Sequence, residues 1–124
     1  MSTRRALLII DHGSRQPAAN ELVEIVAARV RERRPGVIVE HAHMEIAAPS
    51  LADGVAACVA AGALEIIVHP YFLGSGRHTR ETIPKLVAAL AGQHQGITIQ
   101  VSEPLGLHDK LVDVVLERVD ALLE

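Results

Sequence analysis

Short apolar runs alternate with longer segments of helical period along this chain of 124 residues. The apolar runs predict four strands, at Ala6 to Ile10, Val37 to His43, Leu64 to His69 and Ile97 to Val101. Helical spacing of apolar residues predicts four helices, at Asn20 to Arg34, Ser50 to Ala61, Thr82 to Gln93 and Leu107 to Leu123. This alternation is typical of βα units. We therefore expect one α/β domain over residues 1–124, with a four-stranded parallel sheet and helices on both faces.

The loops that follow the strands gather at one edge of such a sheet. Open α/β folds bind ligands at the carboxyl ends of their strands, so functional side chains are expected in these loops. The loops run from Asp11 to Ala19, from Ala42 to Pro49, from Pro70 to Arg80 and from Ser102 to Leu107. The third exceeds the usual length of about two to six residues for a βα loop, which favours a functional role.

Composition narrows the class of protein. Hydrophobic residues make up 49% of the chain, and its single cysteine cannot form an intramolecular disulfide, which fits a reducing compartment. A formal net charge of −3, with one Tyr, one Phe and no Trp, argues against nucleic-acid binding, which relies on positive charge and stacking. No apolar run approaches the roughly 20 residues of a membrane helix. We expect a cytoplasmic protein with neither nucleic acid nor membrane as a partner.

His12 lies where the first predicted strand ends, and Gly13 beside it allows a sharp turn. This place at the ligand edge favours a metal ligand or proton acceptor over a histidine that only hydrogen-bonds its own turn. Ser14 follows closely, but the G-x-S-x-G elbow of serine hydrolases is absent. A serine nucleophile is therefore not expected here.

His41, His43 and Glu45 are spaced by two residues. If the extended conformation continues through Glu45, all three side chains share one face of the second strand. Glu45 is then a candidate proton acceptor, orienting group or oxygen ligand, as an alternative to an ordinary acid before a helix. For His43, the roles of metal ligand and structural residue are equally favoured. His41 is expected to be structural.

The third loop concentrates unusual residues in the stretch PYFLGSGRH, residues 70–78. Tyr71 and Phe72 are the only aromatic residues and are expected to form a pocket wall. The two glycines are a weak nucleotide signal, because Thr79 stands where G-x-G-x-x-G requires its third glycine. His78 precedes the predicted helix, whose N–H dipoles favour a neutral imidazole, so it is a candidate metal ligand rather than a cap.

Cys58 is expected to be a buried thiol, because it lies in the middle of an apolar helix. Although the whole chain is acidic, a local basic set occupies the ligand edge: Arg15, Arg77, Arg80 and Lys85. A polyanionic small ligand explains this surplus, and so does a solvated loop that carries a few cations. The remaining histidines, His69, His94 and His108, are expected to line the pocket floor or to lie at the surface.

Three motifs, in order along nearly the whole chain, resemble the class II tetrapyrrole chelatases. They are His12-Gly13-Ser14-Arg15, Glu45 with Pro49-Ser50-Leu51, and residues 70–78 with Ile83-Pro84. The similarity is greatest to the short sirohydrochlorin chelatases of the CbiX/SirB family. Two positions depart from the family pattern: Thr82 stands where an acid often precedes Ile83-Pro84, and His43 replaces a commonly apolar residue.

The resemblance implies a lyase that inserts cobalt, iron or nickel into sirohydrochlorin without ATP, in cobalamin, siroheme or related tetrapyrrole biosynthesis. It implies no organic cofactor, and the divalent metal is a substrate. His12 and His78 match the catalytic and metal-binding histidines, with Glu45 as a further catalytic residue. Glu45 and His43 are additional candidate ligands for the metal. The candidate substrate contacts are Ser14, Arg15, Tyr71 and Arg77.

The required chemistry agrees with these residue types. Metal insertion must strip water from the ion and remove two pyrrole protons, which calls for neutral imidazoles and a nearby proton acceptor. Magnesium is disfavoured, because it prefers oxygen ligands. A non-catalytic carrier of metal or tetrapyrrole remains an alternative, and a phosphate-ligand enzyme using Gly74 to Gly76 is a remote one. Since one sheet edge offers a flat macrocycle only one wall, we expect a symmetric homodimer.

Overall fold

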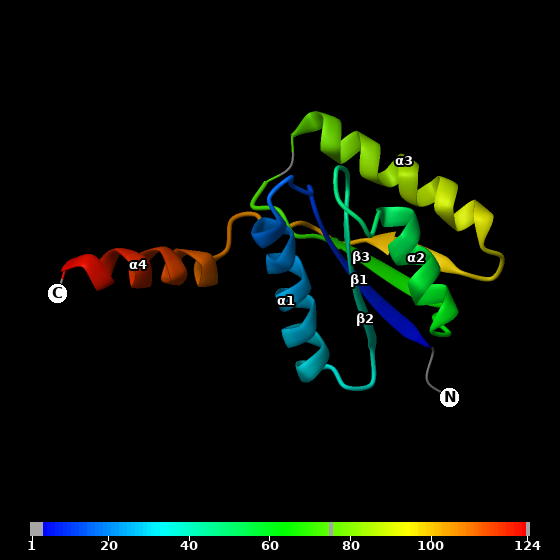
Figure 1. Ribbon diagram of the computed structural model, residues 1–124, viewed down its shortest axis with the longest axis horizontal. Helices are drawn as coiled ribbons and strands as arrows, with labels where there is room; N and C mark the ends of the chain where they lie inside the picture. The colour runs from blue at the N-terminus through cyan, green and yellow to red at the C-terminus, as the bar shows by residue number, and fades with distance from the viewer. Residues whose placement is uncertain (1–3, 75, 124) are drawn as a thin grey trace.

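The computed structural model describes residues 4–74 and 76–123, except for the side chains of residues 78 and 79. The elements follow in the order β1 (Arg5–Asp11), α1 (Pro17–Arg33), β2 (Ile38–His43), α2 (Leu51–Ala60), β3 (Glu65–Pro70), α3 (Arg77–Gln93), β4 (Thr98–Val101) and α4 (Asp109–Leu123). All strand pairs are parallel, and the sheet order is β2-β1-β3-β4 (Figure 1). The predicted α/β class, with four parallel strands in one sheet, is confirmed.

Two predicted helix starts at the ligand edge are wrong, and the extended conformation considered for Glu45 is not found. α1 begins at Pro17 rather than Asn20. α3 begins at Arg77 rather than Thr82, so the third loop covers only residues 71–76. The first turn of α3 is polar and carries an Arg77–Glu81 ion pair at helical spacing, so apolar periodicity alone could not detect it. β2 ends at His43, so the extended conformation does not continue through Glu45. The chain bends there, and Ile46 has a positive φ of 74°.

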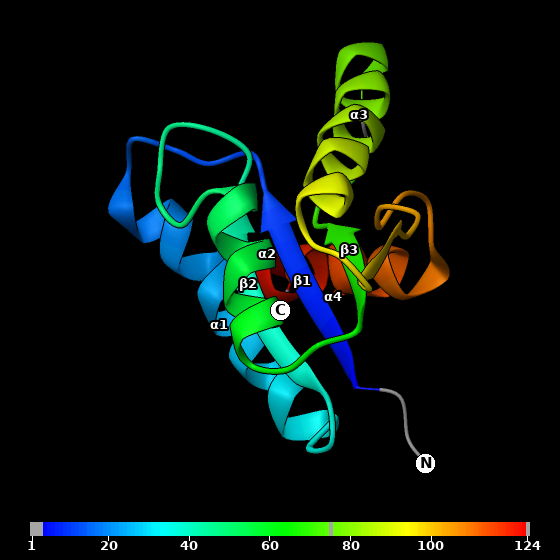
Figure 2. The ribbon, with the colours of Figure 1, turned by 90° about the vertical axis from the view of Figure 1, so that its right-hand side faces the viewer.

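Helices α2 and α3 cover one face of the sheet (Figure 2). The face is lined by alternate strand residues, including Leu8 and Ile10 of β1 and Ile66 and Val68 of β3, all of them fully buried. Gly54 lets α2 approach closely, because a Cβ there would lie 2.7 Å from Cδ1 of Leu8. Most of the buried apolar residues of the chain belong to this layer.

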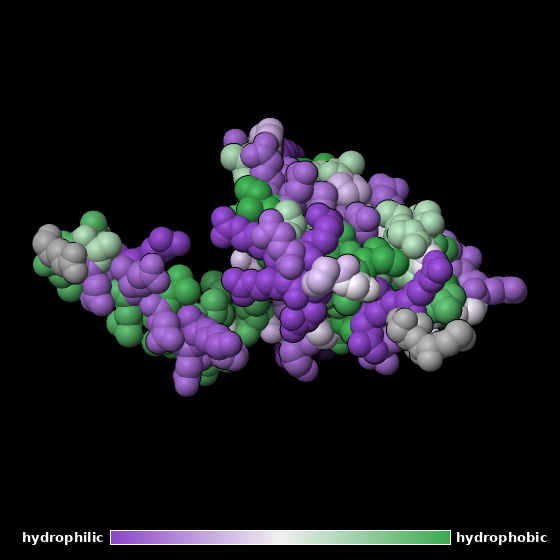
Figure 3. Space-filling view, turned by 90° about the horizontal axis from the view of Figure 1, so that it is seen from below, coloured by the Kyte–Doolittle hydropathy of each residue, from purple (hydrophilic) through white to green (hydrophobic). Residues whose placement is uncertain are grey.

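Within the residues that the structure describes, α1 is the one helix that packs on the opposite face of the sheet. Its core consists of Ile9 and Val39 of the strands with Val23 and Ala27 of the helix. α4 lies apart from the rest of the molecule, and hydrophobic side chains are visible along it (Figure 3). No helix in the described part of the chain is long and apolar enough to cross a membrane.

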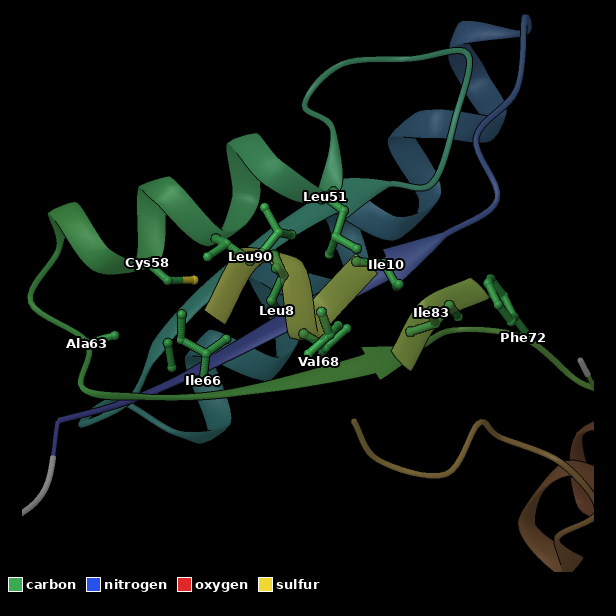
Figure 4. Close-up of a cluster of buried hydrophobic side chains, with 14 residues drawn as sticks. Leu8, Ile10, Leu51, Cys58, Ala63, Ile66, Val68, Phe72, Ile83 and Leu90 are labelled. Atoms are coloured by element: carbon green, nitrogen blue, oxygen red, sulfur yellow. The ribbon is translucent and has the colours of Figure 1, made fainter. Parts of the chain in front are cut away.

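Cys58 is fully buried in α2, inside the layer between the sheet and α2 and α3 (Figure 4). Burial, with a smaller contribution from the negative charge of Glu40, raises the pKa of the thiol to about 12. The sequence expectation of a buried thiol is confirmed. Because the thiolate is the reactive form, the folded chain holds very little reactive sulfur at neutral pH.

We therefore predict that Cys58 resists a thiol reagent such as 5,5′-dithiobis(2-nitrobenzoate) at pH 8. About one thiol in ten thousand is ionised there at a pKa near 12, and the side chain is also inaccessible. The released chromophore measures the reaction. The same chain in guanidinium chloride is the control and should react fully. Rapid stoichiometric labelling of the folded chain would contradict the burial.

Leu8 is fully buried against Gly54 of α2, so its truncation should leave a cavity in the main core. We expect Leu8→Ala to lower the free energy of unfolding by about 2–5 kcal/mol. Leu22→Ala is the matched control, because Leu22 is more than half exposed on α1, and it should change stability by less than about 1 kcal/mol. Denaturant unfolding followed by circular dichroism measures both. Equal losses for the two variants would contradict the assigned core.

Candidate functional site

The turn after β1 and the loop after β2 are joined by backbone hydrogen bonds. The amide of Met44 donates to the carbonyl oxygen of Asp11 at 2.9 Å, and the amide of Glu45 donates to that of His12 at 3.1 Å. Gly13 has a φ of +90°, and a Cβ there would lie 1.9 Å from the carbonyl oxygen of Glu45. His12 and Glu45 are thus brought together at the sheet edge, and only a glycine allows this approach.

Asp11 ties the turn to the end of β2 through its side chain. Its Oδ1 accepts the amide of Gly13 at 3.1 Å and Nδ1–H of His43 at 2.5 Å. The His43 side chain is only 2% exposed. The ring of His41 meets His43 edge to face, with centroids 5.9 Å apart. Because a carboxylate already occupies Nδ1 and the ring is buried, this geometry favours a structural role for His43.

His12 itself is exposed, and its ring stacks on Phe72. The ring centroids are 3.9 Å apart and the planes differ by 10°. Phe72 is only 4% exposed, and its carbonyl oxygen accepts the amide of Leu105 from the loop after β4. Stacking restrains the imidazole through its face, whereas the nitrogen lone pair lies in the ring plane. The restrained ring therefore keeps its nitrogen edge available for an incoming ligand.

The described substrate candidates are distributed around the same edge. Arg15 and Arg77 are exposed, and Arg77 pairs with Glu81 at 3.1 Å. Tyr71 is half-buried and packs beside the α1 core, so it borders the edge on that side. The Ser14 hydroxyl accepts the amide of Gln16 at 3.0 Å and so stabilises the turn that precedes α1.

His78 lies in the first turn of α3, at the same edge of the sheet. Its side chain lies outside the described part of the structure, and so does residue 75 of the preceding loop. Among the side chains that are described, no group of three or more His, Cys, Asp or Glu residues is arranged to hold a metal ion.

A cleft of about 450 Å³ opens beside the ends of β3 and β4. Its lining includes Arg80 and Pro84 of α3 and Ser102 and Glu103 of the loop after β4. It lies next to the Phe72 loop and provides one cation and one carboxylate. The basic residues noted in the sequence therefore do not form one cluster. Arg80 lines this cleft, whereas Arg15 lies in the turn after β1.

His69 lines the opposite side of β3. Burial lowers the pKa of this imidazole. A hydrogen bond to the backbone of Glu103 raises the pKa and so opposes part of this shift. Its Nδ1 lies 2.8 Å from Oγ of Ser102, which in turn donates to the carbonyl oxygen of Glu103. His69 is thus a neutral residue that holds the loop after β4 in place.

Sequence reasoning missed two residues that position the site. Asp11 links Gly13 and His43, and Asn20 holds Ser14 through two hydrogen bonds, at 2.9 Å and 2.8 Å. Asp11 directly precedes His12, so its place at the strand end was a usable signal. Nothing in the sequence marked Asn20, because its contact crosses six residues into the first turn of a helix.

Comparison with known proteins places the chain among relatives with the same architecture. It is 41% identical over 117 residues to the chloroplastic sirohydrochlorin ferrochelatase of Arabidopsis thaliana, covering 94% of this chain and 52% of that protein. It is 31% identical over 137 residues to the sirohydrochlorin cobaltochelatase of Methanocaldococcus jannaschii, covering 91% and 96%. The chain thus spans about half of the plant relative and almost all of the archaeal one.

Solved structures agree with this relationship. A CbiX protein described in terms of cobalamin biosynthesis, from Marinobacter aquaeolei VT8, superposes with a TM-score of 0.82 at 30% identity, covering 96% of this chain and 97% of that one. SirB from Bacillus subtilis with Fe3+ superposes with a TM-score of 0.83 at 26% identity, covering 97% and 48%. The sequence pattern of the family described as CbiX matches residues 6–122. The chain therefore belongs to the CbiX family.

Proposed function

We propose that this chain is an ATP-independent chelatase that inserts divalent cobalt, iron or nickel into sirohydrochlorin. The observation that carries the proposal is the exposed His12 ring, held against Phe72 at the sheet edge beside the Glu45 loop. The relatives support it: their names include both ferrochelatase and cobaltochelatase, and a SirB structure at 26% identity is a complex with cobalt. Both metals accept imidazole nitrogen, so the site chemistry suits either one.

His12 provides the first contact with the metal in this proposal. An in-plane imidazole nitrogen displaces water from the ion, and the stack on Phe72 keeps the ring from swinging away. The ion is a substrate that must leave with the macrocycle, so the protein needs to hold it only briefly. A small number of borderline nitrogen ligands fits that requirement better than a closed site with four protein ligands.

Glu45 is the proposed acceptor of pyrrole protons. Its side chain is exposed, and its backbone amide donates a hydrogen bond to the carbonyl oxygen of His12. The two residues therefore lie next to each other at the sheet edge. Two protons must leave the macrocycle as the metal enters, and an exposed carboxylate can pass them to water. The bent conformation after β2 still allows this role, although it differs from the extended arrangement under which His41, His43 and Glu45 would share one face.

His78 is proposed as the second catalytic imidazole. The family resemblance supports this role, as does its backbone position in the first turn of α3. Amide groups at a helix N-terminus disfavour a protonated imidazole, which keeps it available to a metal ion. His43 is assigned a positioning role instead of the metal contact considered from the sequence, because its buried ring is engaged by Asp11.

Arg15 and Arg77 are proposed to bind carboxylates of the macrocycle. Both side chains are exposed at the strand ends, where a cation can meet a substrate carboxylate directly. Tyr71 and Ser14 are proposed to border the substrate, although each also has the structural contacts described above. No organic cofactor enters the proposed reaction.

A homodimer is proposed to complete the substrate cleft. Three loops at the ligand edge present large exposed aliphatic side chains: Ile46 is 63% exposed, Leu73 70% and Leu107 96%. Apolar residues gathered at one edge are typical of a contact surface. A second copy facing this edge would bury them and enclose a flat macrocycle between two walls. The single buried thiol supports placing this assembly in the reducing cytoplasm.

We predict that His12→Ala and His78→Ala each lower the metallation rate by roughly 100-fold or more, because each removes an imidazole that binds the metal. Glu45→Gln should lower it by about tenfold, because water can replace part of its role. The assay is anaerobic incubation of sirohydrochlorin with cobalt, iron or nickel in turn, followed by the shift of the Soret band.

His94→Ala is the control, because His94 lies at the far end of α3, and it should retain the parent rate. Undiminished metallation by His12→Ala or His78→Ala would sink the assignment. A single stoichiometric binding event with no further turnover would show a carrier instead of an enzyme.

Gly13→Ala should separate positioning from chemistry. The added Cβ would meet the carbonyl oxygen of Glu45 and would also adopt an unfavourable positive φ, at a cost of about 2 kcal/mol or more in stability. We expect the metallation rate to fall with His12 and Glu45 both intact. Gly36→Ala has no such contact and is the matched control. Thermal unfolding measures the loss of stability, and the Soret assay measures the loss of rate. A fully active and stable Gly13→Ala variant would contradict the close approach of Gly13 to the Glu45 carbonyl oxygen.

A further inference from the structure

The cleft between α3 and the ends of β3 and β4 has no role in the reaction proposed above. Its volume of about 450 Å³ lies within the range of roughly 300–1,000 Å³ that is common for small-molecule pockets. Pro70 and Val101 line it where the two strands end, and Pro84 lines it from α3. Two exposed charged residues, Arg80 and Glu103, belong to the same lining. The cleft therefore combines apolar walls with one cation and one anion.

Arg80 is available to a ligand. It forms no ion pair with any carboxylate in the described part of the chain, whereas Arg77 of the same helix pairs with Glu81 at 3.1 Å. The Ser102 hydroxyl also lines the cleft, but it donates to the carbonyl oxygen of Glu103 at 3.1 Å. The planar guanidinium of Arg80 is therefore the group that can donate to a ligand carboxylate here, with two parallel hydrogen bonds.

Both walls of the cleft are held in place before any ligand binds. In the loop after β4, the amide of Ser102 donates to the carbonyl oxygen of Val68 at 2.9 Å, and that of Leu105 donates to the carbonyl oxygen of Phe72 at 3.0 Å. On α3, Ile83 is 3% exposed and packs in the same core as Phe72 (Figure 4). A preformed cleft loses little conformational freedom on binding.

Phe72 connects this cleft to the metal-binding histidine. Its ring stacks on His12 with the centroids 3.9 Å apart, and its carbonyl oxygen holds the loop that forms one cleft wall. The cleft and the His12 imidazole therefore lie on either side of one buried residue. A flat ligand of several rings that is anchored in the cleft can extend past Phe72 towards His12.

We infer that the cleft binds one carboxylate arm of the macrocycle and that Arg80 holds this arm. The inference rests on the proposed function and adds a specificity-determining residue to it. Pro84 and Val101 pack against the aliphatic part of the arm. Glu103 repels a further carboxylate, because like charges at short range disfavour binding. The cleft thus selects a macrocycle that has an acidic arm at this position and fixes how its rings approach His12.

Binding of metal-free sirohydrochlorin to the full chain, followed by its fluorescence without oxygen, tests the two charges. Arg80→Gln should raise the dissociation constant about tenfold, because charge-assisted hydrogen bonds are lost. Arg80→Lys keeps the charge and should stay within about threefold of the parent. Glu103→Gln should lower the constant about threefold, since a like charge is removed. Lys85→Gln is the matched control, because Lys85 is exposed on α3 outside the cleft, and should change it less than about twofold.

These opposite effects separate a charge contact from a loss of structure. Equally tight binding by the parent and Arg80→Gln would overturn the inference, and so would weaker binding by Glu103→Gln. In about 1 M NaCl the Arg80→Gln effect should fall below about threefold, because the Debye length is then about 3 Å. An effect that persists undiminished in this salt would indicate lost packing and overturn the inference.

The Soret assay separates this inference from the proposed activity. Arg80→Gln should raise KM for sirohydrochlorin about tenfold and leave kcat within about twofold of the parent, because its contact lies away from the metal. A lower kcat at unchanged KM would overturn the inference. A parent chain that binds sirohydrochlorin through Arg80 but does not insert metal would overturn the proposed activity and leave the carboxylate site intact. A parent chain that does not bind sirohydrochlorin would overturn both.

Discussion

The backbone of Gly13 passes so close to the Glu45 carbonyl group that no side chain fits between them. This contact depends on a positive φ, and two backbone hydrogen bonds from Met44 and Glu45 hold it. It holds the loops after the neighbouring strands β1 and β2 together at the sheet edge. The position of His12 relative to Glu45 follows from this contact.

Asp11 extends this constraint into the core. Its side chain accepts hydrogen bonds from the Gly13 amide and from the buried ring of His43. It thereby connects the exposed turn after β1 to the end of β2. A hydrogen bond from a buried imidazole to a carboxylate is among the stronger contacts in a protein. The same edge thus contains one histidine that supports the structure and another, stacked on Phe72, that remains open to a ligand.

The two faces of the sheet are covered unequally by the helices. One face is closed by α2 and α3, whereas α1 closes only part of the other. Exposed apolar area costs about 25 cal/mol per Å², so the exposed apolar side chains of α4, such as Val115 and Leu116, add little to the stability of this sheet.

The order and type of the elements could be predicted, because the apolar period changes between strand and helix in every unit. The start of α3 could not, since its first turn from Arg77 is polar. The bend after β2 was also missed, because nothing in the alternation through His43 signals the positive φ at Ile46. The family resemblance rested on motifs at the strand ends, and the comparisons confirm it.

The sequence by itself determined the α/β class, the family and the loops in which His12 and Glu45 lie, because periodicity and motif order are properties of the chain alone. Only the tertiary structure decided that His43 is buried on Asp11 while His12 stacks exposed on Phe72. It also decided that α4 leaves its own sheet. The physical reason is that periodicity tells which side of an element is apolar, whereas distances between elements depend on packing and close backbone approach.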